Sequence, residues 1–187
     1  MESKKDIRKR VLTKRKEILK KVWEENSHKI FEKVVTHPSF LNADEVYCYV
    51  DFKNEVGTKE ILEYAWSLQK KVAVPKILGD DMKFYYINSL HELEEGYFGI
   101  FEPVIENQAE GENVLVVMPG VAFDRQRHRI GYGKGFYDKY LDEHPDYQTM
   151  ALAFELQMVE NIPADEHDIC PQIIITEEQT YAESVTK

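Results

Sequence analysis

Near the N-terminus, apolar residues recur at helical spacing, and neither Gly nor Pro occurs before residue 38. This pattern predicts a basic N-terminal helix over about residues 3–24. A second helix is expected over 27–36, ended by His37-Pro38, because proline disfavours helical geometry in the residue before it. The apolar positions are Ile7, Val11, Leu12, Ile18, Leu19, Val22 and Trp23.

Three cations, Lys4, Arg8 and Arg15, fall inside the apolar sector of the first predicted helix. Either their long side chains reach past an apolar stripe to water, or they point inward at an anion. The charge along the chain is uneven, because residues 1–21 carry +7 within a total of −10. The acidic remainder disfavours non-specific nucleic-acid binding, which needs a broad basic face. A basic arm that touches RNA stays open as an alternative.

Beyond residue 45, short apolar strands alternate with helices and polar loops. Val114–Met118 is the most apolar strand, so it is expected at the centre of a sheet, whereas 82–87 is expected nearer an edge. The alternation predicts a single-domain α/β fold over residues 1–187, a three-layer sandwich with a mostly parallel central sheet and helices on both faces. Residues 88–112 are acidic and are expected to be irregular. The other expected strands are 46–50, 71–75, 149–154 and 172–176, and the other expected helices are 58–70, capped by Thr58, 134–143 and a short one near 156–160.

The segment after the central strand combines glycines with positive charge. Glycines let a backbone approach a ligand closely, and a helix N-terminus favours anions. A carboxylate one turn into the following helix suits magnesium. The segment therefore predicts a site for a phosphate and its Mg²⁺. Its residues are Arg125, Arg127 and Arg129, then Gly131, Gly133 and Gly135 around Tyr132 and Lys134, and finally Asp138.

The spacing differs from two common phosphate loops. His128 stands where a Walker-type loop needs its first glycine, and Gly135 stands where that loop needs Ser or Thr. The dinucleotide fingerprint requires Gly-x-Gly-x-x-Gly, which this loop also lacks. The remaining alternative is a tight strand–helix connection in which glycines serve only the turn.

The bulk composition, 43% apolar, indicates a globular protein. No apolar run reaches the roughly 18 residues of a membrane span, and the charged N-terminus lacks the apolar region of a signal peptide. Cys48 and Cys170 are far apart and without metal-type spacing, so two buried, reduced thiols in a cytoplasmic protein are expected.

Two segments, Met118–Asp124 and Arg129–Asp138, resemble the signature of the 5-formyltetrahydrofolate cyclo-ligases, also called 5,10-methenyltetrahydrofolate synthetases. The similarity in segment order runs over nearly the whole chain. It includes Lys4 and Arg8 in a basic first helix, Glu55 before a helix led by Thr58, and His167-Asp168 before a last strand and Thr176-Glu177. Two positions depart from the family pattern: Gln172 replaces a frequent aspartate, and Phe136 replaces a frequent tyrosine.

The resemblance implies an ATP- and Mg²⁺-dependent cyclisation of 5-formyltetrahydrofolate to 5,10-methenyltetrahydrofolate, with phosphorylation of the formyl oxygen and release of ADP and phosphate. No protein nucleophile is implied, and no role is assigned to His128 or His167. ATP contacts are assigned to Lys4, Lys5, Arg8, Arg129, Gly131, Tyr132, Gly133, Lys134, Gly135, Phe136 and Tyr137. Folate contacts are assigned to Val50, Glu55, Tyr132 and Phe136, with Glu55 accepting hydrogen bonds from the pterin, and Mg²⁺ is assigned to Asp138 and Asp168.

Several alternatives remain open at this point. Asp138 could merely complement the helix dipole, and Asp168 could cap a turn. The whole protein could be a folate or nucleotide binder without turnover, or a related α/β enzyme acting on sugar phosphates or CoA esters. The expected partners are two small-molecule substrates, 5-formyltetrahydrofolate and ATP, with no nucleic acid and no membrane. A monomer is expected, with a dimer as the alternative.

Overall fold

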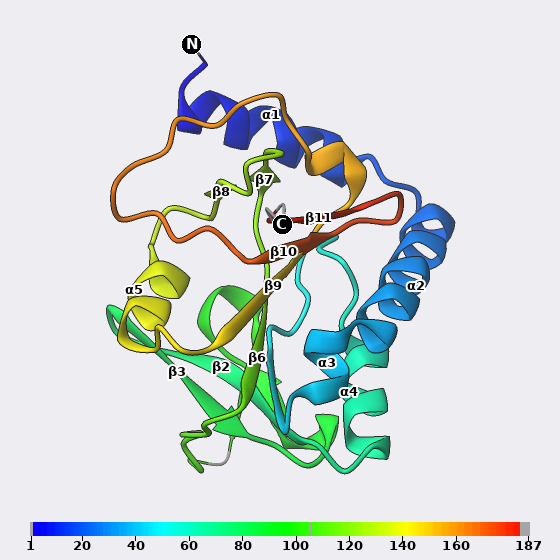
Figure 1. The fold of residues 1–187 in the computed structure, drawn as a ribbon, viewed down its shortest axis with the longest axis vertical. Helices are drawn as coiled ribbons and strands as arrows, with labels where there is room; N and C mark the ends of the chain where they lie inside the picture. The colour runs from blue at the N-terminus through cyan, green and yellow to red at the C-terminus, as the bar shows by residue number, and fades with distance from the viewer. Residues whose placement is uncertain (1, 105, 184–187) are drawn as a thin grey trace.

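The computed structural model describes residues 2–104 and 106–183, and a seven-stranded sheet forms its centre (Figure 1). The five inner strands pair in parallel, and an antiparallel strand closes each edge. The predicted α/β class and mostly parallel sheet are confirmed. In spatial order the strands are β11 (Thr180–Ala182), β10 (Ile173–Ile175), β9 (Gln148–Leu152), β6 (Val114–Met118), β1 (Glu45–Cys48), β2 (Lys71–Leu78) and β3 (Asp81–Tyr86).

The two faces of the sheet are covered by helices that are far apart in sequence (Figure 1). On one face, α2 (Lys20–Thr36), α3 (Pro38–Asn42) and α4 (Lys59–Ser67) pack over a core that includes Val46. On the other face, α5 (Phe136–Glu143) packs over a core that includes Tyr47. Successive residues of a strand point to opposite faces, which is why neighbouring positions in β1 belong to different cores. The strand β6 is buried at all of its positions and lies in the middle, as predicted.

The prediction of a single helix over residues 3–24 is wrong. The chain forms α1 (Lys4–Lys16) and then α2, with Leu19 extended between them. The apolar side of α1 packs on a small separate core with Ile130, whereas α2 packs on the main sheet. The chain must turn to serve both cores, although the apolar spacing continues across the break. The predicted end of α2 at His37 is confirmed.

Two short hairpins were not predicted from the sequence, and one of them lies in the 88–112 segment that was expected to be irregular. The strands β4 (Leu93–Glu95) and β5 (Phe101–Pro103) pair with each other, with the short 3-10 helices η1 (Leu90–Glu92) and η2 (Tyr97–Gly99) beside them. The strands β7 (Ala122–Phe123) and β8 (Arg129–Ile130) pair within the segment before the glycines. These strands of two or three residues are too short to leave a periodic signal.

Two smaller expectations also need correction. Thr58 precedes α4, but its hydroxyl donates to Asp51 instead of capping the helix, and it holds the 51–58 loop closed. Cys48 is buried as expected, whereas Cys170 is half-buried; both are free. Among the described residues, no helix combines the length and apolar character required to cross a bilayer.

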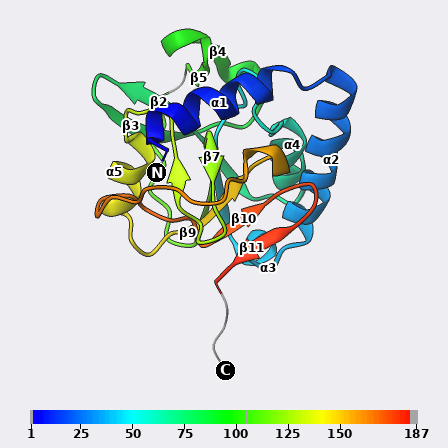
Figure 2. The same cartoon turned by 90° about the horizontal axis from the view of Figure 1, so that it is seen from above.

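The helix α1 lies across the end of the sheet at which its parallel strands finish. It contacts η3 (Glu155–Gln157) and β7, both of which follow carboxyl ends of central strands. Figure 2, seen from above, shows α1 in front of the sheet with β4 and β5 beyond it. Ligands of open α/β sheets bind at this end.

Candidate active site

A cavity of about 780 Å³ opens at the carboxyl end of the sheet, under α1 and the glycine-rich segment. Every residue assigned above to ATP, folate or magnesium lines it, except Lys5, which is exposed on α1. The topology therefore brings together segments from both ends and the middle of the chain. The lining residues are Lys4, Arg8, Leu12, Arg15, Lys16, Tyr49, Val50, Phe52, Lys53, Glu55, Pro75, Ile77, Met82, Tyr97, Phe98, Ile100, Glu102, Pro119, Arg129–Asp138 and Asp168.

The glycine loop, residues 131–135, connects β8 to α5 along one wall of this cavity. Gly133 has a φ of 102° and Gly135, at the N-cap of α5, has a φ of 68°, so a side chain at either position would be strained. Arg8 donates from Nε to the Gly131 carbonyl at 2.9 Å and ties α1 to the loop. A loop of this shape beside a helix N-terminus presents backbone N–H groups to an anion.

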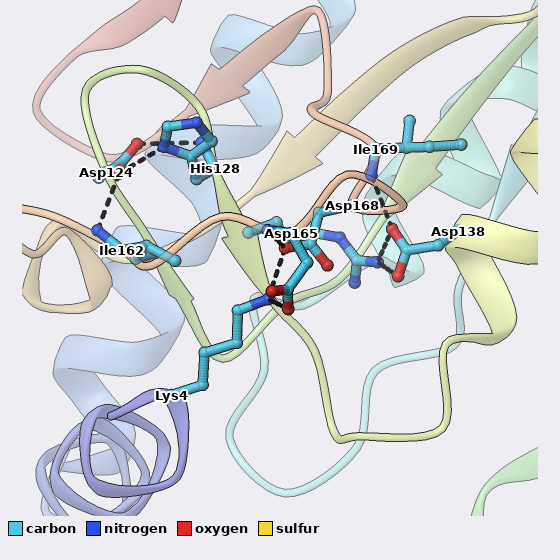
Figure 3. Close-up of polar contacts among 9 residues, drawn as sticks. Lys4, Asp124, His128, Asp138, Ile162, Asp165, Asp168 and Ile169 are labelled. Carbon is cyan, nitrogen blue, oxygen red and sulfur yellow. Dashed lines mark hydrogen bonds and ion pairs between the residues drawn. The ribbon is translucent and has the colours of Figure 1, made fainter. Parts of the chain in front are cut away.

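Arg129 and Asp138 form an ion pair at the base of the loop, with 3.1 Å between Nη2 and Oδ2. The backbone N–H of Ile169 donates to the other carboxylate oxygen at 3.1 Å, as Figure 3 shows. The Arg129 side chain is 5% exposed, and its buried Nε has no hydrogen-bond partner among the described residues. A buried guanidinium with an unused donor at a cavity wall is suited to an additional anion.

The second carboxylate, Asp168, is held by Lys4. The Lys4 ammonium lies 2.5 Å from Asp168 and 2.6 Å from Asp165, bridging α1 and the loop before β10 (Figure 3). Burial works to raise the pKa of the Asp168 carboxyl, but hydrogen bonds from Lys4 and from the Asp165 N–H outweigh it and lower that pKa. Asp168 is therefore kept as an anion at this wall of the cavity.

The carboxylates fit a magnesium ion only if other ligands join them. Across residues 2–104 and 106–183, no group of three or more His, Cys, Asp or Glu side chains is arranged to hold a metal by itself. Asp138 and Asp168 are hard oxygen ligands, and both are already neutralised by a cation. Mg²⁺ commonly takes one or two carboxylates together with substrate phosphates, which matches this donor set.

Glu55, which also lines the cavity, is a buried carboxylate with 6% exposure. Tyr132 donates its hydroxyl to Oε1 at 2.6 Å, and the Phe52 N–H donates to Oε2 at 2.8 Å. Burial raises the pKa of Glu55 to about 7, against the lowering effect of the Tyr132 hydrogen bond and the Arg15 charge. A glutamate with this balance changes charge near neutral pH, which is common at functional sites.

Arg15 is the functional side chain that the sequence predictions left without a role. It is 2% exposed, and its guanidinium donates to the Tyr132 hydroxyl at 2.7 Å and to the carbonyls of Lys53 and Gly120. Its position in the apolar sector of the first predicted helix was the sequence feature that indicated an inward-pointing side chain. Lys4, Arg8 and Arg15 all line the cavity, so their inward direction is correct, and their contact with an anionic ligand stays a prediction.

The second unassigned part of the site is the turn between β4 and β5. Tyr97 and Phe98 line the cavity, and Phe98 is 74% exposed with a φ of 53°. The Gly96-Tyr-Phe-Gly99 turn was visible in the sequence, but its distance from the glycine loop along the chain gave no reason to connect the two.

Other residues singled out in the sequence lie away from the cavity. Arg125 is exposed, and Arg127 donates to the carbonyls of Pro171 and Gln172. His128 bonds to buried Asp124 at 2.8 Å, and the same carboxylate accepts from the Ile162 N–H, which makes this pair a link between loops (Figure 3).

Gln172 and His167 also stand apart from the cavity. The Gln172 side chain accepts from the Thr149 N–H, and its own N–H donates to the Thr149 hydroxyl, so it joins β9 to the segment before β10. His167 is exposed and is not among the residues that line the cavity.

Comparison with known proteins decides the family. The sequence profile of the 5-formyltetrahydrofolate cyclo-ligase family matches residues 1–177. The chain belongs to this family. A cyclo-ligase from Mus musculus is 30% identical over 153 residues, which is 74% of this chain and 75% of the relative. The cyclo-ligase from Haemophilus influenzae is 31% identical over 136 residues, 68% of this chain and 72% of the relative.

Solved structures agree with this membership of the cyclo-ligase family. The 5,10-methenyltetrahydrofolate synthetase from Aquifex aeolicus superposes with a TM-score of 0.87 at 30% identity, covering 98% of this chain and 94% of its own. The synthetase from Mycoplasma pneumoniae gives a TM-score of 0.77 at 23% identity, covering 94% of this chain and 99% of its own, and supports the fold. The resemblance identified in the sequence is therefore confirmed.

Proposed function

We propose that this protein converts 5-formyltetrahydrofolate and ATP into 5,10-methenyltetrahydrofolate, ADP and phosphate. One observation carries the proposal. A single cavity joins the cationic glycine loop and the buried Glu55, in a chain of the cyclo-ligase family. The two walls offer complementary chemistry, one for a polyanion and the other for a neutral heterocycle with hydrogen-bond donors.

At the ATP end, the triphosphate binds along the glycine loop. Lys4 and Arg8 of α1 and Arg129 of β8 supply positive charge, and Lys134 adds a further cation at the exposed edge of the loop. Backbone N–H groups between Gly131 and Tyr137 donate to phosphate oxygens. Lys5 is exposed on α1, so its share is limited to long-range attraction.

Asp138 and Asp168 would hold Mg²⁺ together with the phosphates. When bound, the ion neutralises charge on the phosphate oxygens and orients the transferred group. Arg129 and Lys4, which pair with these two carboxylates, also line the cavity. Because MgATP is still an anion, Lys4 and Arg129 would offset its remaining negative charge.

At the folate end, Glu55 accepts hydrogen bonds from the amino-pyrimidine edge of the pterin. Val50 and Phe136 line the cavity as apolar surfaces for the ring system, and Tyr132 of the glycine loop holds the Glu55 carboxylate at the cavity wall. This arrangement positions the formyl oxygen toward the ATP end, which is the main contribution that the protein makes to the rate.

The reaction needs no protein nucleophile. An N-formyl group is a poor electrophile because its nitrogen lone pair delocalises into the carbonyl. The formyl oxygen attacks the γ-phosphorus and ADP leaves. The N10 amine then attacks the activated carbon and loses its proton. Inorganic phosphate departs with the former formyl oxygen, and the N5 lone pair completes the conjugated ring.

The test is a direct assay with purified protein, 5-formyltetrahydrofolate and MgATP, following the near-ultraviolet absorbance of the conjugated product. The absorbance should rise only when folate, ATP and Mg²⁺ are all present. Parallel mixtures without ATP, or with excess EDTA, are the controls. No rise, with binding of both substrates demonstrated calorimetrically, would contradict turnover and favour the binding-only alternative.

Gln172, which departs from the family pattern, lies away from the cavity and bonds to Thr149. This departure therefore does not support the alternative of a folate or nucleotide binder without turnover. Membership of the 5-formyltetrahydrofolate cyclo-ligase family favours a folate substrate over sugar phosphates and CoA esters. A monomer in the cytoplasm remains the expected state, with size-exclusion chromatography and cell fractionation as its tests.

A further inference from the structure

We propose that Tyr132 is a positioning residue that, anchored by Arg15, holds the Glu55 carboxylate in the orientation and charge state in which it accepts the pterin. This role deepens the proposed function and rests on it, because it requires Glu55 to bind folate. It concerns a contact between the glycine loop and the folate wall of the cavity, and it gives Arg15 a role in the same contact.

The hydrogen bonds around the Tyr132 hydroxyl have one direction. Arginine has donors and no acceptor, so the 2.7 Å contact from Arg15 uses a lone pair of the Tyr132 oxygen. The single hydroxyl proton is then free to point at Glu55 Oε1, 2.6 Å away. The chain of contacts runs from guanidinium through hydroxyl to carboxylate, and each member stabilises the charge of the next.

These contacts leave Glu55 ready for two further donors. An ionised carboxylate offers about four lone-pair directions. One on Oε1 is used by Tyr132 and one on Oε2 is used by the Phe52 N–H. Each oxygen therefore keeps an acceptor position, and the pterin presents two adjacent N–H donors. Protonation of Glu55 would remove one of these acceptors.

The charge state of Glu55 is balanced closely enough for one hydrogen bond to matter. Burial opposes ionisation, whereas the Arg15 charge and the bonds from Tyr132 and the Phe52 N–H favour it, and Asp51 opposes it. Burial, and after it the charge of Glu55, raises the pKa of the Tyr49 and Tyr137 phenols. Loss of the Tyr132 hydroxyl removes the only side-chain donor on Glu55 within the described part of the chain.

Packing alone does not explain this tyrosine. Tyr132 is 48% exposed and is flanked by two glycines of the loop, so its ring contributes little to either core. The two hydrogen bonds and the 5.8 Å approach of the Arg15 guanidinium to the ring are what fix its place.

The test compares Y132F with Y86F. Tyr86 donates to buried Glu45 at 2.6 Å at the opposite end of the sheet, so Y86F removes a matched tyrosine–glutamate bond outside the cavity. Equilibrium affinity for 5-formyltetrahydrofolate is measured by calorimetry between pH 5.5 and 9, alongside steady-state kinetics.

For Y132F we expect folate binding to require a higher pH. A rise of about one unit in the pKa of Glu55 would leave folate affinity about fivefold weaker at pH 7 and close to wild type at pH 9. The folate KM should rise more than kcat falls at neutral pH. The folate affinity profile of Y86F should follow wild type.

The outcomes separate this inference from the proposed function. If Y132F keeps the wild-type pH profile while E55Q loses folate affinity, the positioning role is overturned and the folate site stands. If E55Q binds folate as well as wild type does, both the positioning role and the assignment of Glu55 are overturned. A parallel loss for Y132F at every pH would also overturn the positioning role, because it would indicate a contact with the ligand itself.

Discussion

The Arg129 guanidinium and the Asp138 carboxylate lie 3.1 Å apart, across the glycine loop that separates them in sequence. Asp138 sits one turn into α5 and could have served only the helix dipole, which was the simpler interpretation of its position. Instead it faces the cavity and also accepts from the Ile169 N–H. The pair therefore joins the strand before the loop, the helix after it and the segment that carries Asp168.

Replacing Asp138 by Asn should abolish most catalysis without unfolding the protein. The variant keeps the shape of the side chain and loses the charge proposed to hold Mg²⁺, so kcat should fall about 100-fold or more. Steady-state rates over a range of Mg²⁺ concentrations measure this. D81N is the matched control, because Asp81 forms an exposed pair with Lys139 at 3.3 Å, worth little in stability. Wild-type rates in D138N would remove this residue from the metal site.

Asp168 and Asp165 provide a second matched pair, since both contact the Lys4 ammonium at nearly the same distance. Asp165 is 72% exposed, whereas Asp168 is 21% exposed and lines the cavity. We expect D168N to lose ATP-dependent turnover strongly, and D165N to stay within a few-fold of wild type. Equal effects in calorimetric MgATP titrations would mean that the contact with Lys4, and not metal binding, explains the importance of Asp168.

Lys4 should contribute to ATP affinity and leave folate affinity unchanged. Hydrogen bonds to charged groups contribute about 1.5–3 kcal/mol, so K4M should bind MgATP roughly tenfold or more weakly. K9M, an exposed position on the same helix, is the control for general loss of positive charge. Similar weakening in both variants would point to long-range attraction by the basic helix.

Glu55 should make the free protein less stable at alkaline pH. Its pKa is raised from 4.5 to about 7 in the folded state, so the native protein binds this proton more tightly than the unfolded chain. The resulting stability is fully present below pH 4.5 and is lost as the pH rises through about 7. Relative to E55Q, wild type should lose about 3 kcal/mol of unfolding free energy across that range.

Urea denaturation of wild type and E55Q at a series of pH values measures this difference. The two stability profiles should converge at low pH and separate above neutrality. A variant that is more stable at pH 8 yet binds folate poorly would show that the carboxylate is retained for binding. Parallel profiles would mean that Glu55 keeps an ordinary pKa in the folded protein.

Sequence patterns predicted the parts of the fold whose apolar runs or apolar spacing extend over enough residues to be recognised. Val114–Met118 is a continuous apolar run, and its central, fully buried position followed from that. The break between α1 and α2 did not follow, because Ile18 and Leu19 continue the helical spacing while the chain turns between two cores. Periodicity reports which positions are apolar and not which core they serve.

The candidate site shows the same division. The glycine loop and its carboxylate were predictable because charge, glycine spacing and a helix start occur together between residues 129 and 138. The contact between Arg15 and Tyr132 was not, because it depends on how α1 crosses the sheet. The turn at Tyr97 and Phe98 was missed for the same reason: only the assembled fold brings it to the cavity.

The contact between Lys4 and Asp168 can form only late in the synthesis of the chain. The two residues are 164 positions apart. At the usual 5–20 residues per second, roughly ten to thirty seconds separate their appearance on a ribosome. Until then the first helix lacks the Asp168 carboxylate that holds its ammonium, and the cavity is incomplete. A chain released before residue 168 would carry the glycine loop and most of the sheet, and we expect it to bind ATP poorly.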